Sequence, residues 1–524
     1  MSNRDISATW RYHDTTKHSY ASVRGNAHML DWANQPLPYK IYSGLDPIPL
    51  PTELPELGAP ALSAIAGPPA AVEGEEVPDQ RALASVLFLS AGITKRKRYP
   101  GGEIAFRAAS CTGALYEIEL YVVCQDLAGL AAGLYHFGPA DFALRRLRQG
   151  DYRGVLARAT AGEQSVLHAP LTIVCTGTYW RNAWKYQART YRHFGWDNGT
   201  ILANLLATCT SLGLPASVIC GFVDADVNRL CSLDTQREVA FSMVTVGRVA
   251  TEPPVPPPLD PLTFDTRRLS ASEVDYPVMC EMHAFSSLGI ADEVPAWRAA
   301  ARSLRAAEVE RVPTGAVVEL RPSSDAEMPQ APTERVILRR GSTRRFERGA
   351  SWTFEQLSNA LYRATQGIDA DFLQRSSSTH DTRPPLLNDL YLIVHAVDGL
   401  KPGAYVLCRQ RWALELLREG RFRNEAGYLG LGQDLPADAS LVVFFLADLR
   451  TILAQLGNRG YRATQLEAGI VGGRLYLAAY AQRLGASGLT FYDDDVVEFF
   501  SPHARSKSCI FCMTLGKSAG LRQT

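Results

Sequence analysis

The sequence predicts an α+β protein made of two fused copies of one domain. Three observations support this: an internal match, a recurring order of helices and strands, and a proline-rich boundary. The halves match at a constant offset of 270 residues, too long a period for a solenoid. The matching positions are Tyr121 with Tyr391, Tyr135 with Tyr405, Tyr191-Arg192 with Tyr461-Arg462, and Gly199 with Gly469. We therefore expect a duplicated domain of about 200 residues.

Each half contains predicted elements in the same order. A helical pattern comes first, at 82–94 (ALASVLFLSAGIT) and 354–365 (FEQLSNALYRAT), and short apolar strands follow it. Later, an apolar helical pattern that contains a Leu-Gly step occurs at 204–215 (NLLATCTSLGLP) and 474–487 (RLYLAAYAQRLGAS). A turn, GFVD or TFYD, comes next.

The boundary between the halves is TEPPVPPPLDP, in which six of eleven residues are proline. Proline denies hydrogen bonds to helix and sheet and favours an extended path. The stretch PAWRAAARSLRAAEVE has helical spacing and is expected to bridge the halves. The expected organisation is an N-terminal arm over 1–75, a first domain over 76–250, a linker with a bridging helix over 251–330, and a second domain over 331–524.

Composition and charge exclude several classes of protein. Hydrophobic residues make up 46% of the chain, which is ordinary for a globular protein. Lys plus Arg equals Asp plus Glu at 54 each, so no overall field attracts nucleic acid or an anionic membrane. The N-terminus is polar, and no apolar run reaches the roughly 18 residues of a spanning helix. We expect a cytoplasmic protein with no membrane or nucleic-acid partner.

The ten cysteines are scattered singly through apolar stretches, as is typical of reduced, buried thiols, so no disulfides are expected. One close pair, Cys509 and Cys512, could belong to a metal or redox motif. No second pair or nearby histidine completes four ligands. A buried strand is the favoured interpretation, and no metal is expected.

The second half opens with ILRRGSTRRFERG, which holds five arginines within ten residues beside a serine and a glycine. Guanidinium groups suit the bidentate geometry of a phosphate, and a hydroxyl with backbone N–H groups completes an anion site. The alternative is a solvated basic turn. The first half has no such cluster at the equivalent place, where it reads GPPAAVEGEEVPD.

The first half has a different polar feature, a small-residue turn with Ser110, Thr112 and Gly113 directly ahead of a strand. Small residues and hydroxyls let a flat polar ring or a ribityl chain approach the backbone. A plain surface turn is the alternative. The second half has HDTRPPLLND at this place.

The first half also holds an ionisable pair, Lys185 and Tyr186, where the second half has Gln455 and Leu456. Lysine and tyrosine can take a proton from carbon or nitrogen during a redox step, provided that their pKa values are lowered. Salt-bridged surface residues are the alternative. Because each half carries motifs that the other lacks, we expect one composite site at their interface.

In combination, YHDTTKHS, SAGIT, the SxxGALYxxELY string and KYxxRxYR resemble the nitroreductase superfamily, and within it the SagB-type dehydrogenases associated with azoline oxidation in peptides. The likeness covers nearly the whole chain and implies FMN at an interface between two nitroreductase-like domains, here an intramolecular pseudo-dimer. The chain could be monomeric or dimerise further. It departs from the family string at Ala109-Ser110-Cys111-Thr112-Gly113, where Cys111 is read as a size substitution rather than a redox-active thiol.

The resemblance assigns roles to residues of both halves. The arginine-serine turn would hold the FMN phosphate, residues 488–490 would lie near flavin N5, and the small-residue turn would reach across from the first half. Lys185 and Tyr186 would handle protons. The residues that would bind FMN are Arg340, Ser342, Arg344, Arg107, Ser110, Thr112, Gly113, Gly488, Leu489 and Thr490, with Lys517 as a further candidate.

Three functions are compatible with these features. The first is dehydrogenation of a heterocycle or a related C–N or C–C bond in a peptide-derived or small-molecule substrate, with oxygen reoxidising the flavin. The second is NAD(P)H-dependent reduction of nitro or quinone compounds, which needs no Lys-Tyr pair. The third is a weakly active flavin-binding or docking subunit of a peptide-modifying complex.

Overall fold

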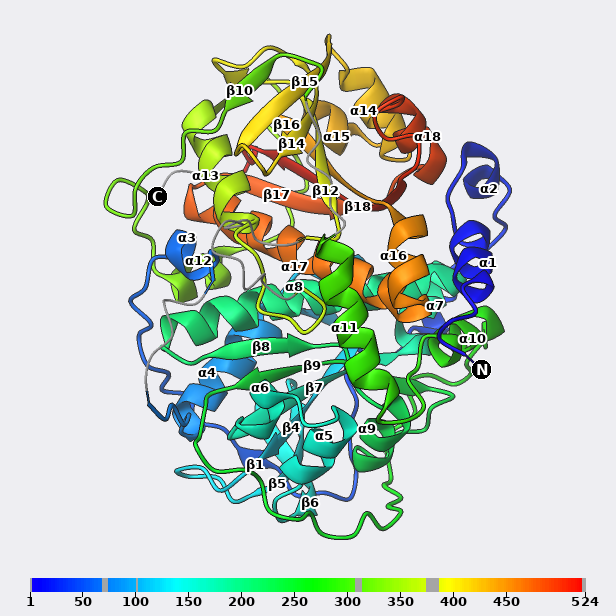
Figure 1. The fold of residues 1–524 in the computed structure, drawn as a ribbon, viewed down its shortest axis with the longest axis vertical. Helices are drawn as coiled ribbons and strands as arrows, with labels where there is room; N and C mark the ends of the chain where they lie inside the picture. The colour runs from blue at the N-terminus through cyan, green and yellow to red at the C-terminus, as the bar shows by residue number, and fades with distance from the viewer. Residues whose placement is uncertain (1, 68–73, 100–101, 307–312, 374–385, 521–524) are drawn as a thin grey trace.

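Two seven-stranded antiparallel sheets form the frame of the protein (Figure 1). The structure is a computed structural model, and it describes all residues except 1, 68–73, 100–101, 307–312, 374–385 and 521–524. The first sheet has the order β1-β6-β5-β4-β7-β9-β8. Its strands are β1 (Ile48–Pro49), β4 (Ile118–Cys124), β5 (Gly133–Gly138), β6 (Ala143–Gln149), β7 (Leu171–Thr178), β8 (Ala216–Ile219) and β9 (Glu238–Val246).

The second sheet repeats this order as β10-β15-β14-β12-β16-β18-β17. Its strands are β10 (Val317–Glu319), β12 (Asp389–Val394), β14 (Gly403–Cys408), β15 (Ala413–Glu419), β16 (Leu441–Ala447), β17 (Gly485–Leu489) and β18 (Ser508–Gly516). Two small sheets pair β2 (Ile93–Tyr99) with β3 (Gly102–Arg107), and β11 (Trp352–Thr353) with β13 (Val397–Asp398). Strands β8 and β17 therefore occupy equivalent edges of the two large sheets.

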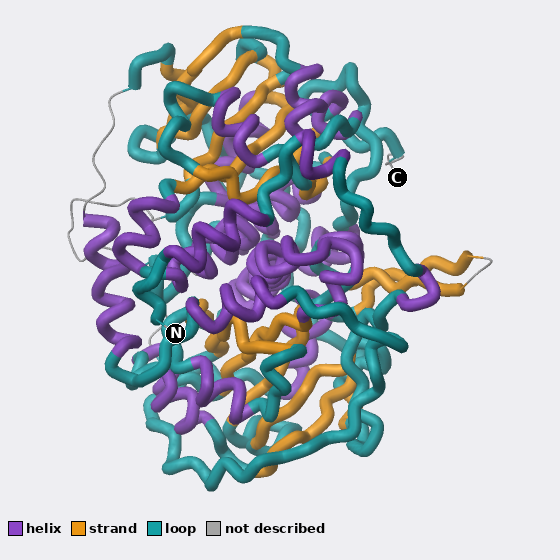
Figure 2. Tube along the Cα trace, turned by 90° about the vertical axis from the view of Figure 1, so that its right-hand side faces the viewer, coloured by secondary structure: helices purple, strands orange, loops and turns teal. Residues whose placement is uncertain are grey.

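Helices fill the space between the sheets, as Figure 2 shows in purple between upper and lower groups of orange strands. The helices of residues 1–250 are α1 (Ser7–Thr15), α2 (Tyr20–Arg24), α3 (Ala61–Ala64), α4 (Gln80–Ala91), α5 (Arg153–Ala159), α6 (Gln164–Leu167), α7 (Tyr179–Tyr186), α8 (Thr190–Ser211) and α9 (Asp224–Leu230). The others are α10 (Pro277–Phe285), α11 (Glu293–Ala306), α12 (Thr333–Arg339), α13 (Phe354–Ala364), α14 (Arg423–Leu429), α15 (Asp434–Asp438), α16 (Leu449–Leu456), α17 (Asn458–Ala481) and α18 (Asp493–Phe499).

The two longest helices, α8 and α17, pack against each other at the centre of the molecule (Figure 1). Both are buried along almost their whole length, so neither shows the one-sided apolar pattern of a surface helix. Glycines allow the close approach: a Cβ atom on Gly199 would lie 2.5 Å from the backbone of Gly469. Similarly, a Cβ on Gly473 would meet Ala203 at 2.5 Å.

Buried ion pairs also join the halves, in a reciprocal arrangement. Asp493, at the start of α18, pairs with two arginines of the first half, and Asp224, at the start of α9, pairs with two arginines of the second half. The N–O distances are 3.1 Å for Arg189–Asp493, 2.7 Å for Arg192–Asp493, 2.6 Å for Arg459–Asp224 and 2.9 Å for Arg462–Asp224. Each half therefore neutralises buried charge of the other.

Several sequence-based expectations can be compared with this fold. The helical stretch expected over 295–310 lies in α11 up to Ala306, and its last four residues lie outside the described residues. The proline-rich boundary forms neither helix nor strand. Cys509 and Cys512 lie in the buried strand β18, and all ten cysteines are free. Ile48–Pro49 of the expected arm and Val317–Glu319 of the expected linker each add an edge strand to a large sheet. Most of the turn HDTRPPLLND lies outside the described residues.

Among the helices that the structure describes, none combines the length and the apolar character needed to cross a membrane.

Candidate active site

The arginine-serine turn of the second half contacts the first half directly. Arg340 follows the last residue of α12, and its Nε donates a hydrogen bond to the Ala108 carbonyl at 2.9 Å. Its Nη2 donates to the Arg107 carbonyl at 3.4 Å, and its guanidinium lies 5.5 Å from the centre of the Tyr476 ring. Arg340 is half-buried, whereas the other four arginines of the turn are exposed. The arginine-serine turn and the small-residue turn are thus neighbours.

Tyr476 of α17 joins the arginine-serine turn to strand β17. Its hydroxyl lies 3.2 Å from Ser342 Oγ and accepts a hydrogen bond from the Gly488 backbone N–H at 2.6 Å. Just beyond β17, Thr490 Oγ1 is buried and has no hydrogen-bond partner among the residues that the structure describes. Because an unpaired buried hydroxyl is costly, Thr490 is suited to receive a ligand.

The small-residue turn of the first half is fixed by α8. The Thr112 backbone N–H and side-chain hydroxyl both donate to Asp197 at 2.9 Å, and Thr200 donates to the Ser110 carbonyl at 2.7 Å. Gly113 has φ of 64°, and a Cβ atom there would lie 2.9 Å from the Tyr186 hydroxyl. Both the conformation and the limited space at this position therefore favour glycine.

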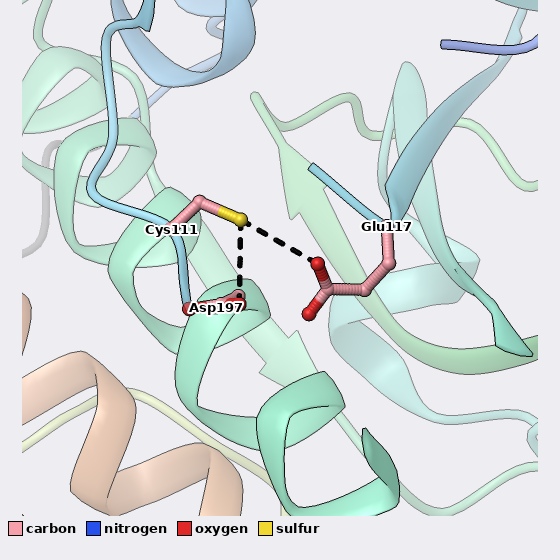
Figure 3. Close-up of side chains that lie close together, drawn as sticks. All are labelled: Cys111, Glu117 and Asp197. Carbon is pink, nitrogen blue, oxygen red and sulfur yellow. Dashed lines mark hydrogen bonds between the residues drawn. The ribbon is translucent and has the colours of Figure 1, made fainter. Parts of the chain in front are cut away.

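Cys111 lies in this turn and contacts two carboxylates (Figure 3). Its thiol donates to Glu117 at 3.4 Å and to Asp197 at 3.3 Å. Burial, followed by the charge of Asp197, raises the pKa of the thiol well above its usual value. Burial and Glu117 also raise the pKa of Asp197, so this carboxyl group tends to keep a proton. A protonated, hydrogen-bonded thiol favours a structural role for Cys111 over a redox role.

Lys185 and Tyr186 form the last turn of α7, next to this small-residue turn. The Lys185 ammonium lies 5.3 Å from the centre of the Tyr186 ring. Burial, assisted by the charge of Arg344, lowers the pKa of Lys185, whereas burial raises the pKa of Tyr186. The condition of a lowered pKa is thus met by Lys185 and fails for Tyr186, whose phenol stays protonated.

Two residues predicted to bind the cofactor already have partners in the protein. Arg107 donates its guanidinium hydrogens to the carbonyls of Pro38 at 2.5 Å and Ile118 at 3.5 Å. Lys517 follows β18 beside the arginine-serine turn, and it forms an ion pair with Glu347 at 3.0 Å. The remaining predicted residues converge on one region, in which Arg344 is exposed and Leu489 is half-buried.

Sequence reasoning missed Tyr476 and Asp197. Tyr476 lies in an apolar helical pattern that indicated only a core helix, and nothing in that pattern marks its hydroxyl. Asp197 carries a signal that could have been used, since a carboxylate inside the apolar stretch HFGWDNGTILANLL needs a partner when it is buried.

The equivalent place in the other half is filled by the chain itself. Strand β8 corresponds to β17, and at the offset of 270 residues Val218 corresponds to Gly488. Val218 donates to the Asp369 carbonyl at 2.8 Å, and the Asp371 N–H donates to Val218 at 3.0 Å. The Asp371 carboxylate accepts from the backbone N–H groups of Cys220 and Gly221 at 2.8 and 2.7 Å. Residues 369–371 therefore occupy the place beside β8 that corresponds to the place beside residues 488–490 in the candidate site. We call residues 369–371 the plug, and the place that they occupy the second location.

Residues 89–248 match the model of the Nitroreductase family. The chain carries a nitroreductase family domain. Nearly the whole chain resembles a crystal structure described as a "putative nitroreductase" from Anabaena variabilis. The TM-score is 0.75, and the identity is 26% over 97% of this chain and 99% of that one. A nitroreductase-like α+β fold therefore extends over nearly the whole chain.

Two curated relatives match shorter parts of the chain. "Putative nitroreductase MJ1384" of Methanocaldococcus jannaschii is 25% identical over 168 residues, which is 32% of this chain and 80% of that protein. Trifolitoxin-processing protein TfxB of Rhizobium leguminosarum bv. trifolii is 30% identical over 158 residues, which is 29% of this chain. The match spans 42% of TfxB, less than half of its length.

Proposed function

We propose that the chain is an FMN-dependent oxidoreductase in which two fused nitroreductase-like domains form an internal pseudo-dimer around one flavin site. The observation that carries this proposal is the hydrogen bond from Arg340 Nε to the Ala108 carbonyl. This hydrogen bond joins the arginine-serine turn of the second half to the start of the small-residue turn of the first half. Neither half holds both motifs.

The residues in this region fit FMN. Arg340, Ser342 and Arg344 would hold the phosphate, because guanidinium groups and a hydroxyl match its oxygens. Residues 488–490 would contact the ring, and the Thr490 hydroxyl, which has no partner among the described residues, would form a hydrogen bond to it. The turn from Ser110 to Gly113 would approach from the other side. A bound FMN supplies a two-electron acceptor that the side chains of the protein lack.

One flavin per chain is supported by the plugged second location. The backbone N–H groups of Cys220 and Gly221 already bind the Asp371 carboxylate, and Val218 pairs with Asp369. A second flavin would have to displace these contacts. Each half would therefore contribute some of the residues of a single flavin site.

The proposed reaction is a SagB-type dehydrogenation of a heterocycle or related bond in a peptide-derived or small-molecule substrate, with oxygen as the final acceptor. Lys185, whose pKa is lowered, would remove a proton from the substrate. Tyr186, whose pKa is raised, would keep its proton and donate a hydrogen bond. The motif combination and the similarity to the trifolitoxin-processing protein support a peptide-derived substrate.

A second candidate is an NAD(P)H-dependent nitro or quinone reductase, which the match over 80% of MJ1384 favours. The two candidates differ in their need for Lys185. Replacing Lys185 with alanine should abolish dehydrogenation but leave a nitro or quinone reductase active. Unchanged turnover with every active substrate would rule out the Lys-Tyr mechanism.

The visible absorption spectrum of the purified protein tests the proposal. We expect one FMN per chain after denaturation, and loss of FMN in Arg340→Ala. Arg345→Ala is the matched control, since Arg345 is an exposed arginine of the same turn. Two FMN per chain would refute the single site. No FMN even after incubation with it would favour a docking subunit of a peptide-modifying complex.

A further inference from the structure

A cavity of about 930 Å³ lies on the first half, beneath residues 261–275. Its floor comes from the start of α7 and the loop after α9, and Lys40 and Tyr42 close one side. The volume is within the range of about 300–1,000 Å³ typical of small-molecule sites. The cavity shares no residue with the candidate active site.

The floor of this cavity carries polar groups that the protein leaves unpaired. Arg181 is fully buried, and its Nη1 donates to the Tyr116 carbonyl at 2.8 Å and to Glu119 at 2.6 Å. Its Nε and Nη2 have no partner among the described residues, and neither does the hydroxyl of Thr178. Nε and Nη2 form one edge of the guanidinium, the edge that receives a carboxylate or phosphate in a bidentate contact.

The charges around the cavity favour an anion. Three of its carboxylates are already paired, since Lys40 binds Glu238 and Arg237 binds both Asp234 and Glu273. Arg267 and Arg268 are exposed on the rim, and in the part of the chain that the structure describes neither forms an ion pair. Asp275 and Arg229 are the other charged lining residues apart from Arg181. The lining is therefore left with a net positive charge.

Apolar side chains complete the lining. Leu233, Leu262, Phe264 and Leu269 face the cavity together with the polar groups. A ligand that uses the whole space would have a charged head for the guanidinium edge and an apolar body for these residues.

We infer that this cavity binds a small organic anion, with its carboxylate or phosphate head on Arg181 and Thr178 and its apolar body under residues 261–275. Arg267 and Arg268 attract the ligand from the rim, so binding weakens as salt concentration rises. Arg181 lies one helical turn before Lys185 on α7, the helix that ends with the proposed proton-handling pair.

Isothermal titration calorimetry with three probes tests this inference on the full chain. N-acetylphenylalanine carries a carboxylate on an apolar body, N-acetylphenylalaninamide is its uncharged match, and phenyl phosphate carries a phosphate. We expect the acid or the phosphate to bind, with the tighter of the two identifying the head group, and the amide to bind about tenfold more weakly or not at all. Equal binding of acid and amide, or no binding of either anion, would overturn the inference.

Substitutions of lining residues test whether the anion binds in this cavity. Arg181→Gln removes the central donor but also breaks a buried ion pair, so Thr178→Val and the rim double variant Arg267→Gln/Arg268→Gln are the decisive tests. Each should weaken binding of the anion several-fold. Arg158→Gln, an exposed arginine on α5 outside the cavity, is the control and should bind like the parent protein. Parent-like binding by both decisive variants would exclude this cavity. Since the measurement needs no flavin, its outcome is independent of the proposed function.

Discussion

Gly199 of α8 and Gly469 of α17 touch through their backbones: a Cβ atom on Gly199 would lie 2.5 Å from the Gly469 Cα atom. Replacing Gly199 with alanine should separate the two central helices. Overpacking costs about 1–3 kcal/mol and outweighs the gain of up to about 1 kcal/mol that alanine brings to a helix, because the backbone of α17 cannot yield. Urea unfolding should show a lower free energy of unfolding. Gly44→Ala, at a glycine with open space around it, should change little, and equal effects would contradict the close contact.

The buried carboxylate of Asp493 should matter far more than its exposed neighbour. Asp493→Asn leaves Arg189 and Arg192 without their anion, and breaking such a buried pair costs about 3–5 kcal/mol. Asp494→Asn removes only a surface pair with Lys17, since the Asp494 side chain is 76% exposed, and should cost less than about 1 kcal/mol. Denaturant unfolding of both variants checks the difference. Similar losses in the free energy of unfolding for both variants would show that the buried ion pairs between the halves contribute little to stability.

The Asp371 plug should make stability depend on pH. Burial raises the pKa of Asp371 to about 6, above the value of about 3.9 for an unfolded aspartate. The folded state therefore binds more protons than the unfolded state between these two values. Its stabilising contribution is complete below pH about 4 and is lost as pH rises through about 6. In Asp371→Asn this dependence should disappear, as measured by the free energy of unfolding at several pH values. A parent-like profile in the variant would contradict the assignment.

Arg344 should control the basicity of Lys185. Its charge contributes to the lowered pKa of Lys185, so Arg344→Gln should raise that pKa. The rise of kcat/KM with pH that reports a deprotonated Lys185 should then shift to higher pH, for any substrate that the protein turns over. Arg345→Gln, at the adjacent exposed arginine, should leave the profile in place. A shift in both variants, or in neither, would argue against this pairing.

The sequence predicted much of the local structure, because helical and strand patterns depend on neighbouring residues. Most of the helical pattern at 82–94, for example, lies in α4, whose apolar side chains are in the core, whereas Ile93 and Thr94 begin β2. The arginine-serine turn and the small-residue turn were recognised from the residue types within each short segment. Their proximity followed only from the argument that each half lacks one of the two.

What the sequence could not reveal depends on contacts between distant segments. The Tyr476 hydroxyl contacts both Ser342 and Gly488, which are distant from each other in the sequence, and no local pattern predicts these contacts. The direction of the Tyr186 pKa shift depends on burial against Gly113 and on nearby acidic groups of the first half. The plug by residues 369–371 needs a strand from the other half of the chain.

The plug also bears on how such a protein can evolve. In a dimer of identical chains, any change that closes one cavity is copied into its partner, since both are read from the same gene. A single reading frame that encodes both halves removes this coupling, so Asp371 could arise against Cys220 and Gly221 while the opposite face stayed open. A location closed in this way can be selected for rigidity alone.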